Sequence, residues 1–136
     1  MKNSILYIVF FLPVVFISMN LASGDGPEEV NKKILAAIGA GNAEDLSGYF
    51  NSMVDCGIMG TEDTYSKAQA ARIIQTFFDK YPVKTVKITK QGTSTDGSQF
   101  SIGELGAGGK TFRLFYLLKK ISGDYVIQQF QIQEEH

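Results

Sequence analysis

Residues 110–134, KTFRLFYLLKKISGDYVIQQFQIQE, contain two runs of alternating apolar side chains. The residues that share one face are Phe112, Leu114, Tyr116 and Leu118 in the first run and Val126, Gln128, Phe130 and Ile132 in the second. A period of two is typical of a half-buried strand. Ser122-Gly123-Asp124 separates the runs and suits a tight turn. The stretch therefore predicts an antiparallel hairpin.

The same period extends back to Val83. Val86 and Ile88 alternate with polar residues, and Phe100 and Ile102 are expected to continue the inward face. Asp96-Gly97 and the glycine-rich residues 106–109 mark turns between these strands. Short connections between sequential strands predict an antiparallel meander.

Helical patterns precede the meander. Apolar residues recur at helical spacing over 30–38, after Pro27 and two acidic residues that suit a first turn. Asn42 can cap a short second helix that runs towards Phe50. Ser66 and Gln69 have the spacing of a capping box, which predicts a third helix over 66–80.

Between the second and third helices, residues 53–58 alternate and predict a short strand, and Asp63-Thr64 is expected in a turn. Helices gathered before a meander indicate an α+β fold. We expect three helices packed on one face of a curved antiparallel sheet.

The N-terminus resembles a signal peptide. Met1-Lys2-Asn3 precedes 13 uncharged residues, Ile5 to Ile17, and Ala22-Ser23-Gly24 offers small residues for cleavage. The apolar run is shorter than the roughly 20 residues of a membrane span. We expect a signal peptide over 1–24, a single domain over 25–136, and a periplasmic or extracellular location without a stable membrane anchor. An uncleaved anchor is the alternative.

The composition restricts the chemistry of this domain. The formal net charge is −1, and the only arginines are Arg72 and Arg113, so nucleic acid is not an expected partner. The single histidine is His136, which removes the commonest general base and metal ligand from the body of the chain. We expect no cofactor and no metal site. Cys56 is the single cysteine; we expect it in the core, with a reactive or intermolecular thiol or a metal ligand as the alternatives.

The opposite parity of the last two strands is unusually apolar for a solvated sheet face. It carries the candidate dimer-face residues Arg113, Phe115, Leu117, Tyr125 and Ile127. An apolar patch on a polar face suggests a partner that covers it, often a second copy of the chain. The alternative is a sheet face that stays lightly exposed or is covered by the N-terminal segment.

Five stretches of the chain resemble a family of small secreted Bacteroidota proteins of unknown function with the nuclear transport factor 2-like (SnoaL-like, cystatin-like) fold. The stretches that carry the resemblance are residues 41–46, 65–70, 96–100, 115–120 and 125–129. The resemblance implies a cone formed by helices and a curved sheet. Catalytic members of the fold generally use an aspartate or histidine inside the cone, whereas Asp55 falls on the opposite parity from Val54 and Cys56.

Two hypotheses follow for the function. The first is a non-catalytic binding or interaction module, as a homodimer or as a binder of a small apolar ligand. The second is a small-molecule enzyme of the isomerase or dehydratase type that uses the cone. The polar groups expected to reach such a pocket are Tyr49, Glu104, Tyr116 and Gln128. Packing and rim positions are the alternative for these side chains.

Overall fold

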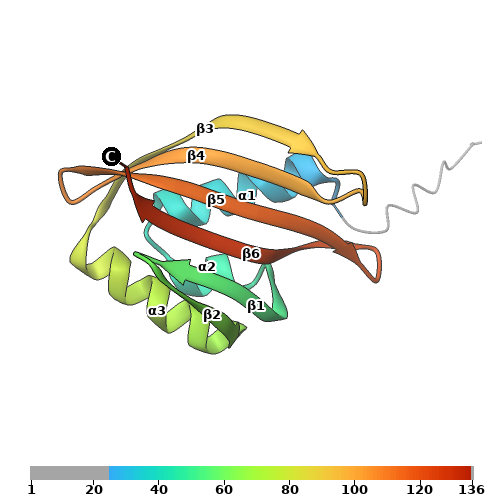
Figure 1. Cartoon of the computed structure of the whole chain (residues 1–136), viewed down its shortest axis with the longest axis horizontal. Coiled ribbons are helices and arrows are strands. Elements are labelled where there is room, and N and C mark those ends of the chain that lie inside the picture. The colour runs from blue at the N-terminus through green and yellow to red at the C-terminus, as the bar shows by residue number, and fades with distance from the viewer. Residues whose placement is uncertain (1–24, 136) are drawn as a thin grey trace, which may run out of the picture.

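The computed structural model describes residues 25–135 (Figure 1). The expected signal peptide, residues 1–24, and His136 lie outside the described residues. Three helices and six strands follow one another in the described part. Their bounds are α1 Pro27–Gly39, α2 Ala43–Ser47, β1 Phe50–Ile58, β2 Thr61–Ser66, α3 Lys67–Lys80, β3 Val83–Thr93, β4 Gln99–Ala107, β5 Lys110–Ile121 and β6 Asp124–Glu134.

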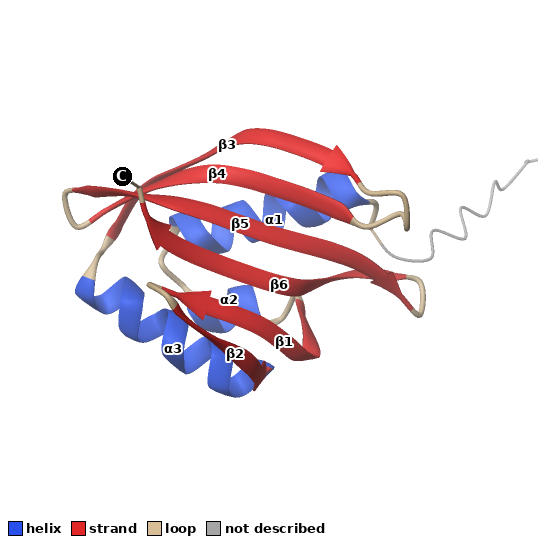
Figure 2. Cartoon of the chain, viewed as in Figure 1, coloured by secondary structure: helices blue, strands red, loops and turns tan. Residues whose placement is uncertain are grey.

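The six strands form one sheet in the order β2-β1-β6-β5-β4-β3. Strands β3 to β6 make the expected antiparallel meander. The sheet is nevertheless mixed, because β1 pairs with β6 in parallel. The three helices lie together on one side of this curved sheet (Figure 2). The α+β class and the helices on one face are therefore as expected, and the parallel pairing is the difference.

A proline and two capping residues determine where the three helices begin. Pro27 stands in the first turn of α1, and the Asn42 side chain accepts a hydrogen bond from the Asp45 amide at the start of α2. The capping box of α3 is present in both directions between Ser66 and Gln69. These three ends confirm the predictions made from the sequence.

The prediction of a turn at Asp63-Thr64 is wrong. Both residues lie in β2, an edge strand whose first four side chains are exposed. The turn lies earlier, at Met59 and Gly60, which have φ values of 54° and 87°. Because β2 has no buried face over most of its length, it lacks the alternation that reveals a strand.

The core fills the space between the helices and the sheet. Apolar side chains from all three helices meet the inner face of the sheet there, among them Ile34, Leu46, Ile74, Leu114, Tyr116 and Phe130. Cys56 belongs to this core, and burial raises the pKa of its thiol to about 11. The expected packing role of Cys56 is confirmed, because a thiolate is the reactive form and burial disfavours it.

The predicted inward face of β4 is wrong. Ser101, Gly103, Leu105 and Ala107 face the core, so Phe100 and Ile102 point outward. At one of these inner positions, Gly103, the backbone of β3 lies too close to leave room for a side chain. A Cβ at Gly103 would lie 2.4 Å from the carbonyl oxygen of Lys87.

A β-bulge in β6 makes a second prediction wrong, namely which residues of this strand face outward. Leu117 pairs with Gln129 whereas the next residue, Leu118, pairs with Ile127, which leaves Gln128 as the extra residue. A bulge of this kind shifts the alternation by one position. Ile127 is fully buried in the core and Tyr125 packs against that core. Neither residue therefore belongs to the outer face where the sequence placed them.

Within the described residues, no helix combines the length and the apolarity needed to cross a bilayer.

Candidate functional site

Of the four predicted pocket residues, only Tyr116 lies inside the cone. It is fully buried, and its hydroxyl donates a 2.7 Å hydrogen bond to Oδ1 of Asn31 on α1. Burial raises the pKa of Tyr116, and a hydrogen bond with Ser101 acts in the opposite direction. The hydrogen bond to Asn31 ties α1 to the sheet. A neutral phenol is also a poor proton acceptor at neutral pH, so Tyr116 is ill suited to act as a general base.

Gln128 and Tyr49 lie away from Tyr116. Gln128 is the extra residue of the bulge, and its side-chain oxygen accepts a 2.9 Å hydrogen bond from the side-chain amide of Asn51. The side-chain nitrogen of Gln128 donates to the backbone carbonyl of Met53 at 3.5 Å. Its amide thus joins β6 to β1. Tyr49 is half-buried at the end of α2, and its carbonyl accepts a hydrogen bond from the Ile127 amide at 2.6 Å.

Glu104 is on the opposite side of the sheet from Tyr116. Its side chain is exposed, and in the register of the sheet it stands between Lys87 on β3 and Arg113 on β5. The expectation that it reaches the cone or its rim is wrong, because the inward face of β4 is the opposite one. The four candidate residues consequently do not converge on one pocket.

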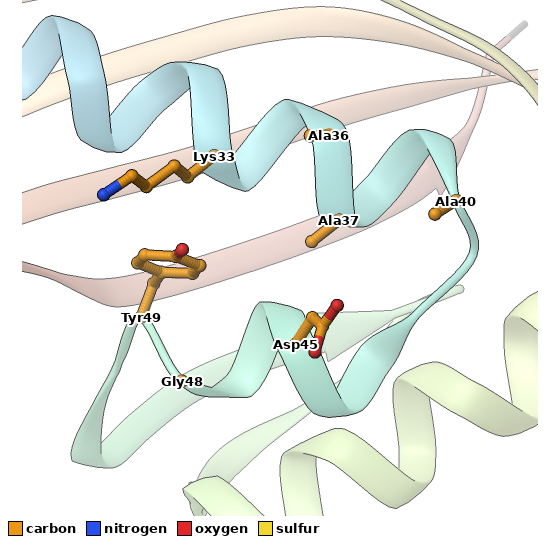
Figure 3. A pocket seen from close by; sticks show the side chains of 7 residues that line it. All are labelled: Lys33, Ala36, Ala37, Ala40, Asp45, Gly48 and Tyr49. Carbon is orange, nitrogen blue, oxygen red and sulfur yellow. The ribbon is translucent and has the colours of Figure 1, made fainter.

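A groove of about 580 Å³ runs between α1 and α2 (Figure 3). Its wall on α1 is formed by small side chains, Ala36, Ala37 and Ala40, and Asp45 points into it from α2. At one end the Lys33 side chain lies near the Tyr49 ring. Lys33 already pairs with Asp25, which raises the pKa of its amine. The groove thus presents few polar groups free to act on a ligand.

The outer sheet face carries a different arrangement. Four half-buried apolar side chains lie side by side on β4 and β5, with Phe100 opposite Leu117 and Ile102 opposite Phe115. We call these four residues the outer patch. The helices lie on the other side of the sheet and do not cover it (Figure 2). Phe115 and Arg113, with three glutamines of β6, also line a depression of about 340 Å³ beside the patch.

Opposite charges flank the outer patch. On the β3 side, Lys87 and Lys90 pair in register with the outward residues Glu104 and Ile102. On the β1–β2 side, Asp55 accepts a 2.7 Å hydrogen bond from Thr64, and Glu62 accepts one from Gln131 at 3.2 Å. One edge of this face is therefore basic and the other is acidic.

A second groove, of about 500 Å³, lies beside α3. The turn between β1 and β2 and the end of α3 form its walls, and Met59 and Ile73 are among its lining residues. This groove could not be predicted from the sequence, because it depends on β2, whose polar residues resemble a loop. Among residues 25–135, no group of three or more histidine, cysteine, aspartate or glutamate side chains is placed to hold a metal ion.

Comparisons with known proteins identify the fold and the family. A family model described as "Domain of unknown function (DUF4783)" matches residues 31–133. A DUF4783 family protein from Bacteroides uniformis has 28% identity and a TM-score of 0.73, over 79% of this chain and 98% of that chain. A second, from Bacteroides ovatus, has 30% identity and a TM-score of 0.71, over 76% and 94%. Among curated protein sequences, none matches this chain.

A nuclear transport factor 2-like protein from Cytophaga hutchinsonii shares the architecture at 17% identity, with a TM-score of 0.59 over 82% of this chain and 100% of that chain. The three helices and the curved sheet thus define an α+β protein of the nuclear transport factor 2-like fold. Within this fold, the chain belongs to the DUF4783 family, a family of unknown function. The fold itself does not specify an activity, since sites vary between proteins that share it.

Proposed function

We propose that the protein is an exported, non-catalytic interaction module that binds a second copy of itself through the outer sheet face. The observation that carries this proposal is the outer patch. Phe100, Ile102, Phe115 and Leu117 gather on β4 and β5, on a sheet face that no helix of the described chain covers. Contiguous apolar surface with a polar rim is typical of protein interfaces.

The charges at the two edges favour one orientation of the partner. A two-fold axis that runs parallel to the strands between β6 and β5 would stack outer face on outer face. It would place β3 of one copy over the β1–β2 edge of the other, and the outer patch of one copy over β6 and β1 of the other. Lys87 and Lys90 of each copy would then meet Asp55 and Glu62 of its partner. The same surface is thus complementary to itself, as a two-fold interface requires.

The residues inside the cone support a non-catalytic role. Tyr116 is hydrogen-bonded to Asn31, and Glu104, the predicted pocket residue with a carboxylate, lies on the opposite side of the sheet. General acid–base catalysis needs its groups within hydrogen-bond reach of one substrate atom. These side chains cannot act together, which favours a binding module over an isomerase or dehydratase.

The export part of the proposal rests on the sequence of residues 1–24. The apolar run and the small residues before Asp25 fit a cleaved signal peptide, and the protein would then act in the periplasm or outside the cell. N-terminal sequencing of the protein recovered from its host should begin near Asp25.

A double substitution tests the outer patch. Phe115→Lys with Leu117→Lys should convert a dimer of residues 25–136 into a monomer in sedimentation velocity, because four charges would be buried without partners at each interface. Ala36→Lys, which adds one charge at an exposed position of α1, is the matched control and should leave the dimer intact. Circular dichroism checks that both variants fold. A folded double variant that sediments like the wild type would contradict the proposal.

A further inference from the structure

The groove beside α3 has a largely apolar lining. Its apolar lining residues are Ile58, Met59, Tyr65, Ile73, Phe77 and Tyr81. Ile73 belongs to the apolar stripe of α3, yet it is only half-buried, whereas its neighbour Ile74 is fully buried. A volume of about 500 Å³ lies within the roughly 300–1,000 Å³ of small-molecule sites.

Met59 is held at the edge of this groove by an unfavourable backbone conformation. It occupies the first turn position between β1 and β2, with a φ of 54°, and its side chain remains 38% exposed. Asparagine or glycine is the usual residue at such a position. The methionine therefore costs backbone strain without belonging to the buried core. Flexible methionine side chains are frequent at surfaces that bind apolar ligands.

One end of the groove is positively charged. The ammonium of Lys80 lies 5.4 Å from the centre of the Tyr81 ring, and that of Lys110 lies 5.9 Å from the same ring. Lys110 is 3.5 Å from a carboxylate oxygen of Glu134. Within residues 25–135, Lys80 takes part in none of the ion pairs. Lys80 is also in the last turn of α3, where a cation offsets the negative end of the helix dipole.

We propose that this groove binds a small amphiphile with an apolar chain and an anionic head group. The chain lies along Ile58, Met59 and Ile73, and the head group is placed beside Lys80. Tyr81 stands at the junction, with its apolar ring towards the chain and the two ammonium groups around it. This site is independent of the outer sheet face, since none of its lining residues belongs to the outer patch.

Three twelve-carbon probes separate the contributions of chain and head group. Dodecanoate, dodecanol and dodecyltrimethylammonium are titrated into residues 25–136 below their aggregation concentrations, with binding followed by calorimetry and amide NMR shifts. Dodecanoate should bind the most tightly and shift amides of residues 58–61 and 73–81. Equal binding of the cationic probe, shifts that map elsewhere, or no saturable binding of dodecanoate would overturn the proposal.

Variants identify the residues responsible. Lys80→Gln should weaken dodecanoate roughly two- to fivefold, which is the range of an exposed ion pair, and leave dodecanol unchanged. Lys33→Gln, in the α1–α2 groove, is the matched control and should change neither. Equal effects of the two lysine variants on dodecanoate would overturn the role of Lys80 and, with it, the proposal of an anionic head group.

Met59→Gly gives a test that misfolding cannot imitate. Glycine relieves the strain at this turn position, so the variant should keep or raise the melting temperature. It should nevertheless weaken all binding of dodecanoate and dodecanol by removing apolar contact. Unchanged affinity for both probes would contradict the proposal. A change in sedimentation of Ile73→Lys relative to the wild type would also contradict it, because the groove would then be an interface between copies.

Discussion

The hydroxyl of Tyr116 on β5 donates a 2.7 Å hydrogen bond to the side-chain oxygen of Asn31 on α1. This bond joins the centre of the sheet to the first helix inside the cone. It explains why a tyrosine occupies a fully buried position, since a buried hydroxyl needs a partner. The same bond occupies the hydroxyl of the one predicted pocket residue that lies inside the cone.

Loss of this bond should reduce stability. Tyr116→Phe keeps the ring and removes the hydroxyl, so we expect the free energy of unfolding to fall by about 1 kcal/mol. Urea denaturation measures the difference. Tyr49→Phe, whose ring is half-buried, provides the control and should change the midpoint less. Equal midpoints for Tyr116→Phe and the wild type would mean that α1 is held by packing alone.

The capping box at the start of α3 should contribute a measurable amount to stability. Ser66→Ala removes the acceptor of the Gln69 amide and should cost about 1 kcal/mol. Thr76→Ala in the same helix is a suitable control. Its hydroxyl bonds only to the Arg72 carbonyl at an exposed position, and alanine has the higher helix propensity. If both variants unfold at the wild-type midpoint, the helix does not depend on its cap.

Gly103 should tolerate no side chain. A Cβ there would lie 2.4 Å from the Lys87 carbonyl oxygen and 3.2 Å from the Ile88 side chain, so Gly103→Ala should cost about 1–3 kcal/mol. Gly39→Ala has only a 3.7 Å neighbour at the end of α1 and should be neutral or stabilising. A neutral effect at Gly103 would show that β3 and β4 can separate without loss.

Cys56 should make stability fall at high pH. Burial raises the pKa of its thiol from 9.0 to about 11, so the folded state holds the proton more tightly than the unfolded state. The stability that the folded state gains from this protonated thiol is therefore fully present below pH 9 and is lost as the pH rises from 9 to 11. Cys56→Ala should flatten this part of the profile relative to the wild type. Identical slopes in the two proteins, or rapid labelling of the native thiol at pH 8, would contradict the burial.

The charges on the outer face should determine how tightly two copies bind. Lys87→Glu with Lys90→Glu should weaken the dimer roughly tenfold, because exposed ion pairs contribute about 0.2–1 kcal/mol each. Adding Asp55→Lys and Glu62→Lys should restore it, since the two edges then exchange signs. Sedimentation equilibrium at low salt measures the constants. Failure of the second pair to restore affinity would rule out the proposed orientation.

The sequence predicted what depends on neighbouring residues and missed what depends on distant ones. The ends of α2 and α3 follow from Asn42 and Ser66, whose side chains bond within four residues. The outward orientation of Phe100 and Ile102 depends instead on which face of β4 packs on the core, and the buried position of Ile127 depends on a bulge opposite β5. The alternation of apolar and polar residues along the sequence predicts neither of these two features.

The candidate sites also include residues that local alternation predicts and residues that depend on distant parts of the chain. Arg113, Phe115 and Leu117 lie on the outer face where alternation along β5 places them, because the bulge is in β6 and β5 itself alternates regularly. The outer patch gains Phe100 and Ile102, which the sequence placed inside. The groove beside α3 could not be found without β2, whose charged and exposed residues resemble a loop.

Zero-length carbodiimide cross-linking of mixed ¹⁴N- and ¹⁵N-labelled protein tests the central claim most directly. Strands β3 and β1 are four positions apart in the sheet, roughly 19 Å, so a bond between their side chains cannot form within one copy. The proposed dimer predicts cross-links of Lys87 or Lys90 to Asp55 or Glu62 that join a light to a heavy chain. Their absence at concentrations where the protein is dimeric, or a monomer at every concentration, would contradict the account.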